Sequence, residues 1–160
     1  MAEPRSTSRS ASLSIPLPYS QTERIYISLG LREKAITVFL TTATEEEAAS
    51  GGAQTPLGSF VYGMPDKYNP TQPLSTALCT VEPTIEFATR LAKLIARKKQ
   101  MPVYVGNSIS FRSTGLGGSV EEEMEGFGVV VRAVLGGLKE LEEEEEERNN
   151  INGLEGGLEG

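Results

Sequence analysis

The side chains that could carry out chemistry in this sequence are few, and their types restrict the reactions available. The 160 residues include no histidine, and Cys79 is the one cysteine. This composition excludes Ser/His/Asp and Cys/His catalysis, histidine metal sites and an internal disulfide. General acid–base chemistry by paired carboxylates remains, and Glu82 and Glu86 could share a helix face for it.

The acidic residues, however, form no pattern typical of an active site. Asp66 is the only aspartate, and the glutamates cluster in predicted loops or at helix starts. No spacing indicates a buried carboxylate pair beside a pocket, so we expect a protein that binds rather than reacts, with no catalytic residue, cofactor or metal. Cys79 is predicted to be a small buried apolar residue, and a lone thiol fits a reducing compartment.

The segment 84–111 gives the clearest structural signal. Apolar residues recur every three or four positions and predict one apolar helix face, made of Ile85, Ala88, Leu91, Ala92 and Ile95. The segment 103–111 then alternates as a strand does, with Asn107 as the exception.

Five further strands are predicted before this helix, from alternating runs at 12–20, 23–34, 35–44, 57–64 and 73–79. The first contains Pro16 and Pro18, which lack backbone donors, so it can only be an edge strand. The second and third form an antiparallel hairpin, because only the short polar turn at 32–34 separates their alternating residues. The segment 45–56, rich in small and acidic residues, is predicted to be a flexible surface loop.

A second helix is predicted from apolar residues at steps of four and three, namely Val120, Met124, Phe127, Val131, Val134, Leu138 and Leu141. Because several glycines weaken it, we expect a secure helix near Met124 to Leu135 and a frayed end beyond Gly136.

The acidity of the chain is concentrated at its C-terminal end. The segment 139–160 holds nine acidic and two basic residues, so it accounts for the whole net charge of −7. We expect a disordered N-terminus at 1–10, a single domain at 11–138 and a disordered acidic low-complexity tail at 139–160. The body before the tail is neutral, which argues against a general nucleic-acid binder. No apolar run is long enough to predict a membrane span or a signal peptide.

The order of these elements predicts an α+β fold, with an approximately six-stranded, largely antiparallel sheet and two helices packed on one face. Aliphatic residues occupy one face of the strands and are assigned to the helices. The other face would then carry Tyr26, Phe39 and Tyr104 among small polar residues, a mixture typical of a protein interface. The alternative is that loops or the first strand cover these rings within one chain.

A second candidate surface is basic. The predicted helix carries five cationic residues, Arg90, Lys93, Arg97, Lys98 and Lys99. They either steer the protein onto an acidic patch of a partner or form a solvated helix face whose last charges suit the helix dipole.

Several stretches of the sequence resemble a fungal proteasome assembly chaperone of the fourth type. They are SLSIPLPYSQTERIYISLGLREKAITVFL, GSFVYGMPDKYNPTQPLSTALC, FATRLAKLIARKKQMPVYVGNSISF and VEEEMEGF, which together span roughly residues 12 to 135. The most telling pieces are PLSTALC, TRLAKLIARKKQMPVYVG and EEEMEGF. The resemblance does not extend to the 45–56 insert, to Gly117-Gly118 or beyond Leu138.

The resemblance implies a non-enzymatic chaperone that pairs with a sister chaperone of the third type, of similar fold. Such a heterodimer binds proteasome α subunits while the α ring of the 20S core particle forms. It implies a location in cytoplasm and nucleus. From the neutral body and the lack of a long apolar run, we expect neither nucleic acid nor membrane among the partners. The sequence leaves two other functions open, a carboxylate-based enzyme and a generic dimeric structural adaptor.

Overall fold

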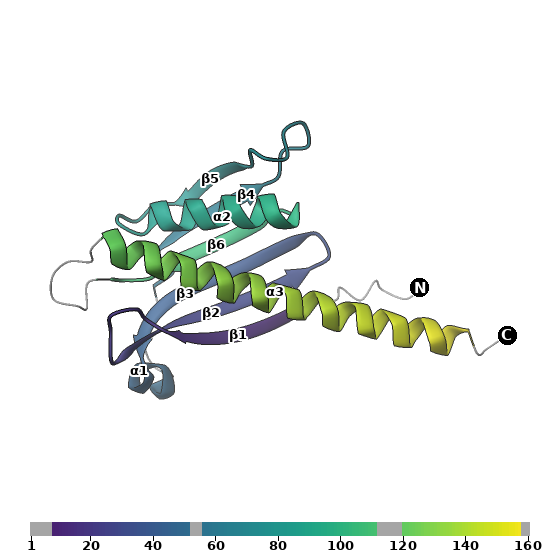
Figure 1. Ribbon diagram of the computed structural model, residues 1–160, viewed down its shortest axis with the longest axis horizontal. Coiled ribbons are helices and arrows are strands. Elements are labelled where there is room, and N and C mark those ends of the chain that lie inside the picture. The colour runs from purple at the N-terminus through teal and green to yellow at the C-terminus, as the bar shows by residue number, and fades with distance from the viewer. Residues whose placement is uncertain (1–7, 52–55, 112–119, 158–160) are drawn as a thin grey trace.

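The computed structural model describes residues 8–51, 56–111 and 120–157, which form one mixed sheet with two long helices (Figure 1). The strands are β1 (Arg9–Pro16), β2 (Glu23–Arg32), β3 (Ala35–Thr44), β4 (Ser59–Met64), β5 (Leu74–Cys79) and β6 (Val103–Ser108). The helices are α1 (Glu45–Ser50), α2 (Ile85–Lys99) and α3 (Val120–Gly156). The strand order is β1-β2-β3-β6-β4-β5.

The predicted fold class is confirmed. Every neighbouring pair of strands is antiparallel except β3 with β6, because α2 carries the chain across the sheet before β6 is added beside β3. The β2–β3 hairpin forms as predicted. β1 lies at one edge of the sheet and pairs only with β2, so Pro16, the register partner of Arg24, stands in an edge strand, where a proline is tolerated.

Both long helices cover the same face of the sheet (Figure 1). α2 packs over β4, β5 and β6, and α3 packs over β1 and β2. The aliphatic strand face is fully buried beneath them, and Ile25, Val38 and Val105 are each 0% exposed. The predicted apolar face of α2 is buried as well, apart from Ile85, which packs at its margin. Burial of this continuous apolar layer is the main force that holds the helices on the sheet.

The apolar spacing of α3 identified part of its contact with the core: Val134, Leu138 and Leu141 are buried as predicted, and Phe127 and Val131 are partly buried against it. The buried positions are Glu122, Gly126, Val130, Val134, Gly137, Leu138 and Leu141, whereas Val120 and Met124 are largely exposed. A Cβ added at Gly137 would lie 2.5 Å from Leu29 Cδ1. Gly137 is therefore a contact residue, because only glycine lets the helix backbone approach the sheet this closely.

The expectation that α3 frays beyond Gly136 and that 139–160 is disordered differs from the structure, in which α3 continues to Gly156. Leu138 and Leu141 are buried, and Lys99 Nζ lies 3.0 Å from Glu142 Oε2. Packing and this contact extend the helix past the glycines, and Glu and Leu are strong helix formers. At about 55 Å, α3 is longer than the sheet that it crosses, and its acidic end projects beyond β1 (Figure 1). Residues 158–160 lie outside the described residues.

Two segments predicted to lack regular structure form short ordered elements. Glu45–Ser50 is helix α1, with Thr44 as its N-cap: Thr44 Oγ1 accepts from Glu47 N at 3.2 Å, and Glu47 Oε2 accepts from Thr44 N at 3.0 Å. This reciprocal capping box is the physical reason that the acidic segment does not form a loop. Arg9 and Ser10, placed in a disordered N-terminus, belong to β1, and Arg9 Nη1 donates to Leu141 O at 3.2 Å. Residues 1–7 lie outside the described residues.

No helix in the described part of the chain combines the length and apolarity needed to cross a lipid bilayer.

Candidate protein-binding surfaces

Five aromatic side chains lie on the sheet face opposite the two long helices, and we call them the aromatic face: Tyr26, Phe39, Phe60, Tyr62 and Tyr104. Strand alternation places them there, because their neighbours in each strand are the buried residues beneath α2 and α3. Phe39 is 40% exposed, and the other four rings are half-buried.

Four of the rings form a continuous row across β3, β6 and β4. Phe39 and Phe60 stack with centroids 6.2 Å apart, Phe60 and Tyr104 at 6.0 Å, and Tyr104 and Tyr62 at 4.8 Å. Gly106 on β6 makes the first contact possible, because it is the register partner of both Phe39 and Phe60. A Cβ at Gly106 would lie 2.7 Å from Phe39 Cδ1. The two rings therefore meet over a position that has no side chain.

The described residues of the chain leave this row uncovered. β1 lies beside β2 at the edge of the sheet and does not cross the rings. Leu57, just before β4, approaches Gly106 beside Phe39 but is itself 47% exposed. A hollow of about 400 Å³ opens between Leu57, Phe39 and Tyr26. The three predicted rings thus lie on one face, and their role as a partner-binding surface stays a prediction.

Sequence reasoning missed Phe60 and Tyr62. The signal was present in the segment SFVYGM, where both rings alternate with the buried Val61 and Gly63. What the sequence did not reveal is that β6 is inserted between β3 and β4, which brings rings from three strands into one row.

The structure divides the five predicted basic residues. Arg90, Lys93 and Arg97 are exposed and line a common groove of about 590 Å³, which we call the basic groove. Lys98 is exposed but does not line it. Lys99 is only 20% exposed because its ammonium group pairs with Glu142 on α3. The geometry therefore supports three of the five residues as a common surface.

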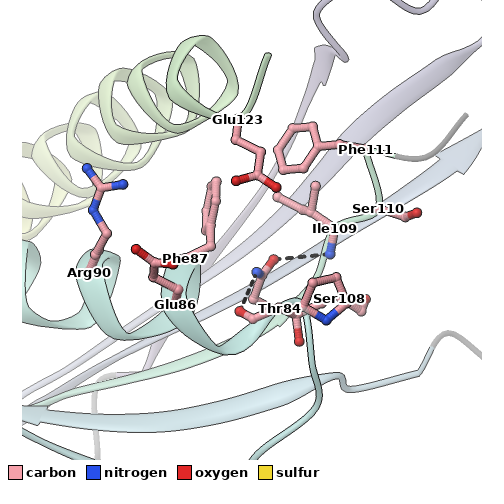
Figure 2. A pocket seen from close by; sticks show the side chains of 11 residues that line it. Thr84, Glu86, Phe87, Arg90, Ser108, Ile109, Ser110, Phe111 and Glu123 are labelled. Atoms are coloured by element: carbon pink, nitrogen blue, oxygen red, sulfur yellow. Dashed lines mark hydrogen bonds between the residues drawn. The ribbon is translucent and has the colours of Figure 1, made fainter. Parts of the chain in front are cut away.

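A third hollow, of about 450 Å³, lies at the N-terminus of α2 (Figure 2). Asn107, the exception in the strand pattern, is 1% exposed beside it. Its Nδ2 donates to Thr84 O and its Oδ1 accepts from Ile109 N, each at 3.1 Å. Both ends of the amide are thus used to join β6 to the start of α2. We assign Asn107 a structural role, because a buried amide needs such partners.

The proposed carboxylate pair does not form on a helix. α2 begins at Ile85, so Glu82 precedes it and shares no helix face with Glu86, which lines the hollow of Figure 2 with Glu123. Among the described residues, no group of three or more His, Cys, Asp or Glu side chains is placed to hold a metal ion. Cys79 was predicted to be buried and is exposed, because it ends the outermost strand, where no further element packs on it.

Comparisons with known proteins agree with this architecture. A family model described as proteasome assembly chaperone 4 matches residues 24–109, which run from the second residue of β2 to just past the end of β6. Among solved structures, the chain is similar to a chain in the "Crystal Structure of a Novel Chaperone Complex for Yeast 20S Proteasome Assembly". The TM-score is 0.57 at 17% identity, covering 82% of this chain and 95% of that chain, a likeness of fold. The comparison with curated proteins found no match.

Proposed function

Because the chain belongs to the proteasome assembly chaperone 4 family, we propose that it is a non-enzymatic chaperone that pairs with a sister chaperone of the third type. In this proposal the heterodimer binds proteasome α subunits and promotes formation of the α ring of the 20S core particle. The proposal places it in the cytoplasm and nucleus. The observation that carries it is the aromatic face, a row of rings on the open side of a sheet whose other side is covered.

The aromatic face is suited to a partner of similar fold. A sister chain with the same architecture would also have one sheet face covered by helices and one open. Two such faces can pack against each other about 10 Å apart, as sheets do in sandwiches. Aromatic residues are enriched in interface cores, and an exposed apolar surface of this kind is stabilised when a partner removes it from water.

The helix side of the molecule remains free in such a heterodimer. Arg90, Lys93 and Arg97 lie on α2, on the opposite side of the sheet from the aromatic face. One chain can therefore bind a sister and an α subunit at the same time. We propose these three residues as the α-subunit contact. For Lys98 and Lys99 the same role stays a prediction that the geometry does not favour.

The test is a pull-down of the tagged chain from growing cells, with mass spectrometry of the bound proteins. We expect a small sister subunit and proteasome α subunits, without mature peptidase activity. Recovery of the chain alone or with unrelated partners would contradict the proposal. In size-exclusion chromatography the chain should then be run alone and with the sister, because a stable homodimer that ignores the sister would favour the generic structural adaptor instead.

Charge reversal tests the α-subunit contact separately. We expect Arg90→Glu with Arg97→Glu to weaken binding of the heterodimer to α subunits by about tenfold or more at low salt, with a smaller difference at high salt, because charge steering is screened. Pairing with the sister should be unchanged. The matched control is Lys98→Glu, on the same helix but outside the groove. Unchanged binding by the double variant would contradict the proposed contact and favour the alternative, in which these cationic residues form a solvated helix face.

A further inference from the structure

The basic groove combines free positive charge with exposed apolar side chains. Lys99 is paired with Glu142, but Arg90, Lys93 and Arg97 form no ion pair with a described residue. Apolar parts of Leu74, Leu94 and Phe127 line the same groove, and Leu74 is 52% exposed. A solvated helix face needs no apolar lining, so this combination points to a ligand that is both acidic and apolar.

The groove holds one arginine in place for a carboxylate, and its own acidic residue pairs with none of the three cations. The guanidinium carbon of Arg90 lies 4.5 Å from the centre of the Phe127 ring, which holds the side chain flat. A guanidinium held in this way loses less conformational freedom when it binds, and its N–H groups remain available to a carboxylate. The single carboxylate in the groove, Asp66, accepts from Tyr68 N at 2.9 Å within its own turn. Asp66 reduces the positive charge of the groove without pairing with the three cations.

The spacing along α2 restricts the shape of the ligand. Arg90 and Arg97 are seven residues apart, which puts them on one side of the helix about 10 Å apart. An extended peptide advances about 3.3 Å per residue and turns every second side chain to the same side, so two acidic side chains four positions apart face the helix together, about 13 Å from each other, and the long arginine side chains can reach both. Leu94 lies between the two arginines in sequence and lines the groove with them, where it can contact an apolar side chain midway between the two acidic ones and on the same side of the peptide.

We propose that the basic groove binds an extended segment of a proteasome α subunit that carries acidic residues about four positions apart, with an apolar residue midway between them. This inference rests on the proposed function, and it names the kind of sequence recognised and the residues that recognise it. The groove stays accessible in the proposed heterodimer, because Arg90, Lys93 and Arg97 belong to α2, which lies on the helix side of the sheet (Figure 1).

Fluorescence anisotropy of the full-length heterodimer with a labelled peptide, Glu-Ser-Leu-Ser-Glu, tests the groove directly. We expect saturable binding, with an affinity about tenfold lower for the matched peptide Gln-Ser-Leu-Ser-Gln, since each exposed charge pair contributes modestly. Arg90→Gln with Arg97→Gln should lower the affinity by about tenfold as well, and Lys98→Gln by less than about twofold. Circular dichroism verifies that each variant remains folded.

Three outcomes would overturn the inference: no saturable binding, an equal loss of affinity in Lys98→Gln and in the double arginine variant, or displacement of the peptide by a single-stranded oligothymidylate at lower concentration than by unlabelled peptide. The last would indicate a nucleic-acid surface.

The pull-down described above distinguishes failure of the groove assignment from failure of the proposed function. Capture of α subunits by the double glutamine variant at the wild-type level overturns the groove assignment alone. If the wild-type chain captures no α subunits, both the proposed function and the assignment of the bound segment to an α subunit are overturned.

Discussion

Phe39→Glu is expected to abolish pairing with the sister chaperone while the isolated chain keeps its far-UV circular dichroism. Phe39 is 40% exposed, so the isolated chain can place a glutamate there in water. In a sheet-to-sheet interface the same carboxylate would be buried without a partner, which costs several kcal/mol, or about a thousandfold or more in affinity. Size-exclusion chromatography of the mixed subunits, with binding measured by calorimetry, checks this result.

Two controls make the Phe39 result specific. Phe39→Leu keeps an apolar side chain but loses the stacking on Phe60, so pairing should weaken by only about tenfold, the equivalent of one aromatic contact. Lys34→Glu adds the same negative side chain at the exposed β2–β3 turn and should pair normally. Normal pairing by Phe39→Glu would remove the aromatic face as the dimer surface. The membership of the family would stand, and the interface would have to lie elsewhere.

The second large effect concerns the contact between α3 and the sheet. Gly137→Leu is expected to lower the free energy of unfolding by about 3 kcal/mol, because the new side chain must displace Leu29 and Leu13 in a packed core. Gly136→Leu, one residue earlier, is expected to raise it by about 0.5–1 kcal/mol, because nothing lies within 4 Å of a Cβ there and leucine favours helix more than glycine does. Urea unfolding followed by circular dichroism measures both changes.

The prediction is specific because the two substitutions should change the free energy of unfolding in opposite directions. The two substitutions are chemically identical and differ only in which side of α3 they occupy. A stabilised Gly137→Leu would mean that α3 does not rest on β1 and β2 at this point. Equal destabilisation by both would indicate that the glycines are required for a bend in the helix rather than for its close approach to Leu29.

Local patterns in the sequence were sufficient for most elements of the fold. The three-and-four spacing from Ile85 to Ile95 and the alternation from Val103 onward predicted α2 and β6, because these periods directly report which side faces the core. α1 was also readable, since Thr44 and Glu47 have the spacing of a capping box. The small and acidic composition of 45–56 predicted a loop instead, because composition alone does not reveal the reciprocal cap between Thr44 and Glu47.

Other errors had tertiary causes. The apolar spacing in α3 placed Met124 in the core, and the glycines of the segment predicted a frayed helix beyond Gly136. Neither holds, because the helix rests on Gly126 and Gly137, which no scale of hydrophobicity identifies as contact residues. Beyond Gly136 the helix is held against the body of the protein at Leu141, which is buried and whose carbonyl oxygen accepts from Arg9, more than a hundred residues away in the chain.

The sequence by itself determined the types of element, the sheet face that the helices cover and the lack of histidine- or disulfide-based chemistry. These properties follow from composition and from short periods, which act between near neighbours. Only the tertiary structure decided which side chains share a surface. β6 enters between β3 and β4, so Phe39, Phe60 and Tyr104 form one row. α3 lies beside α2, so Glu142 pairs with Lys99 and Phe127 orients Arg90. Such contacts depend on chain crossings that local sequence does not encode, and the binding surfaces of this protein are made of them.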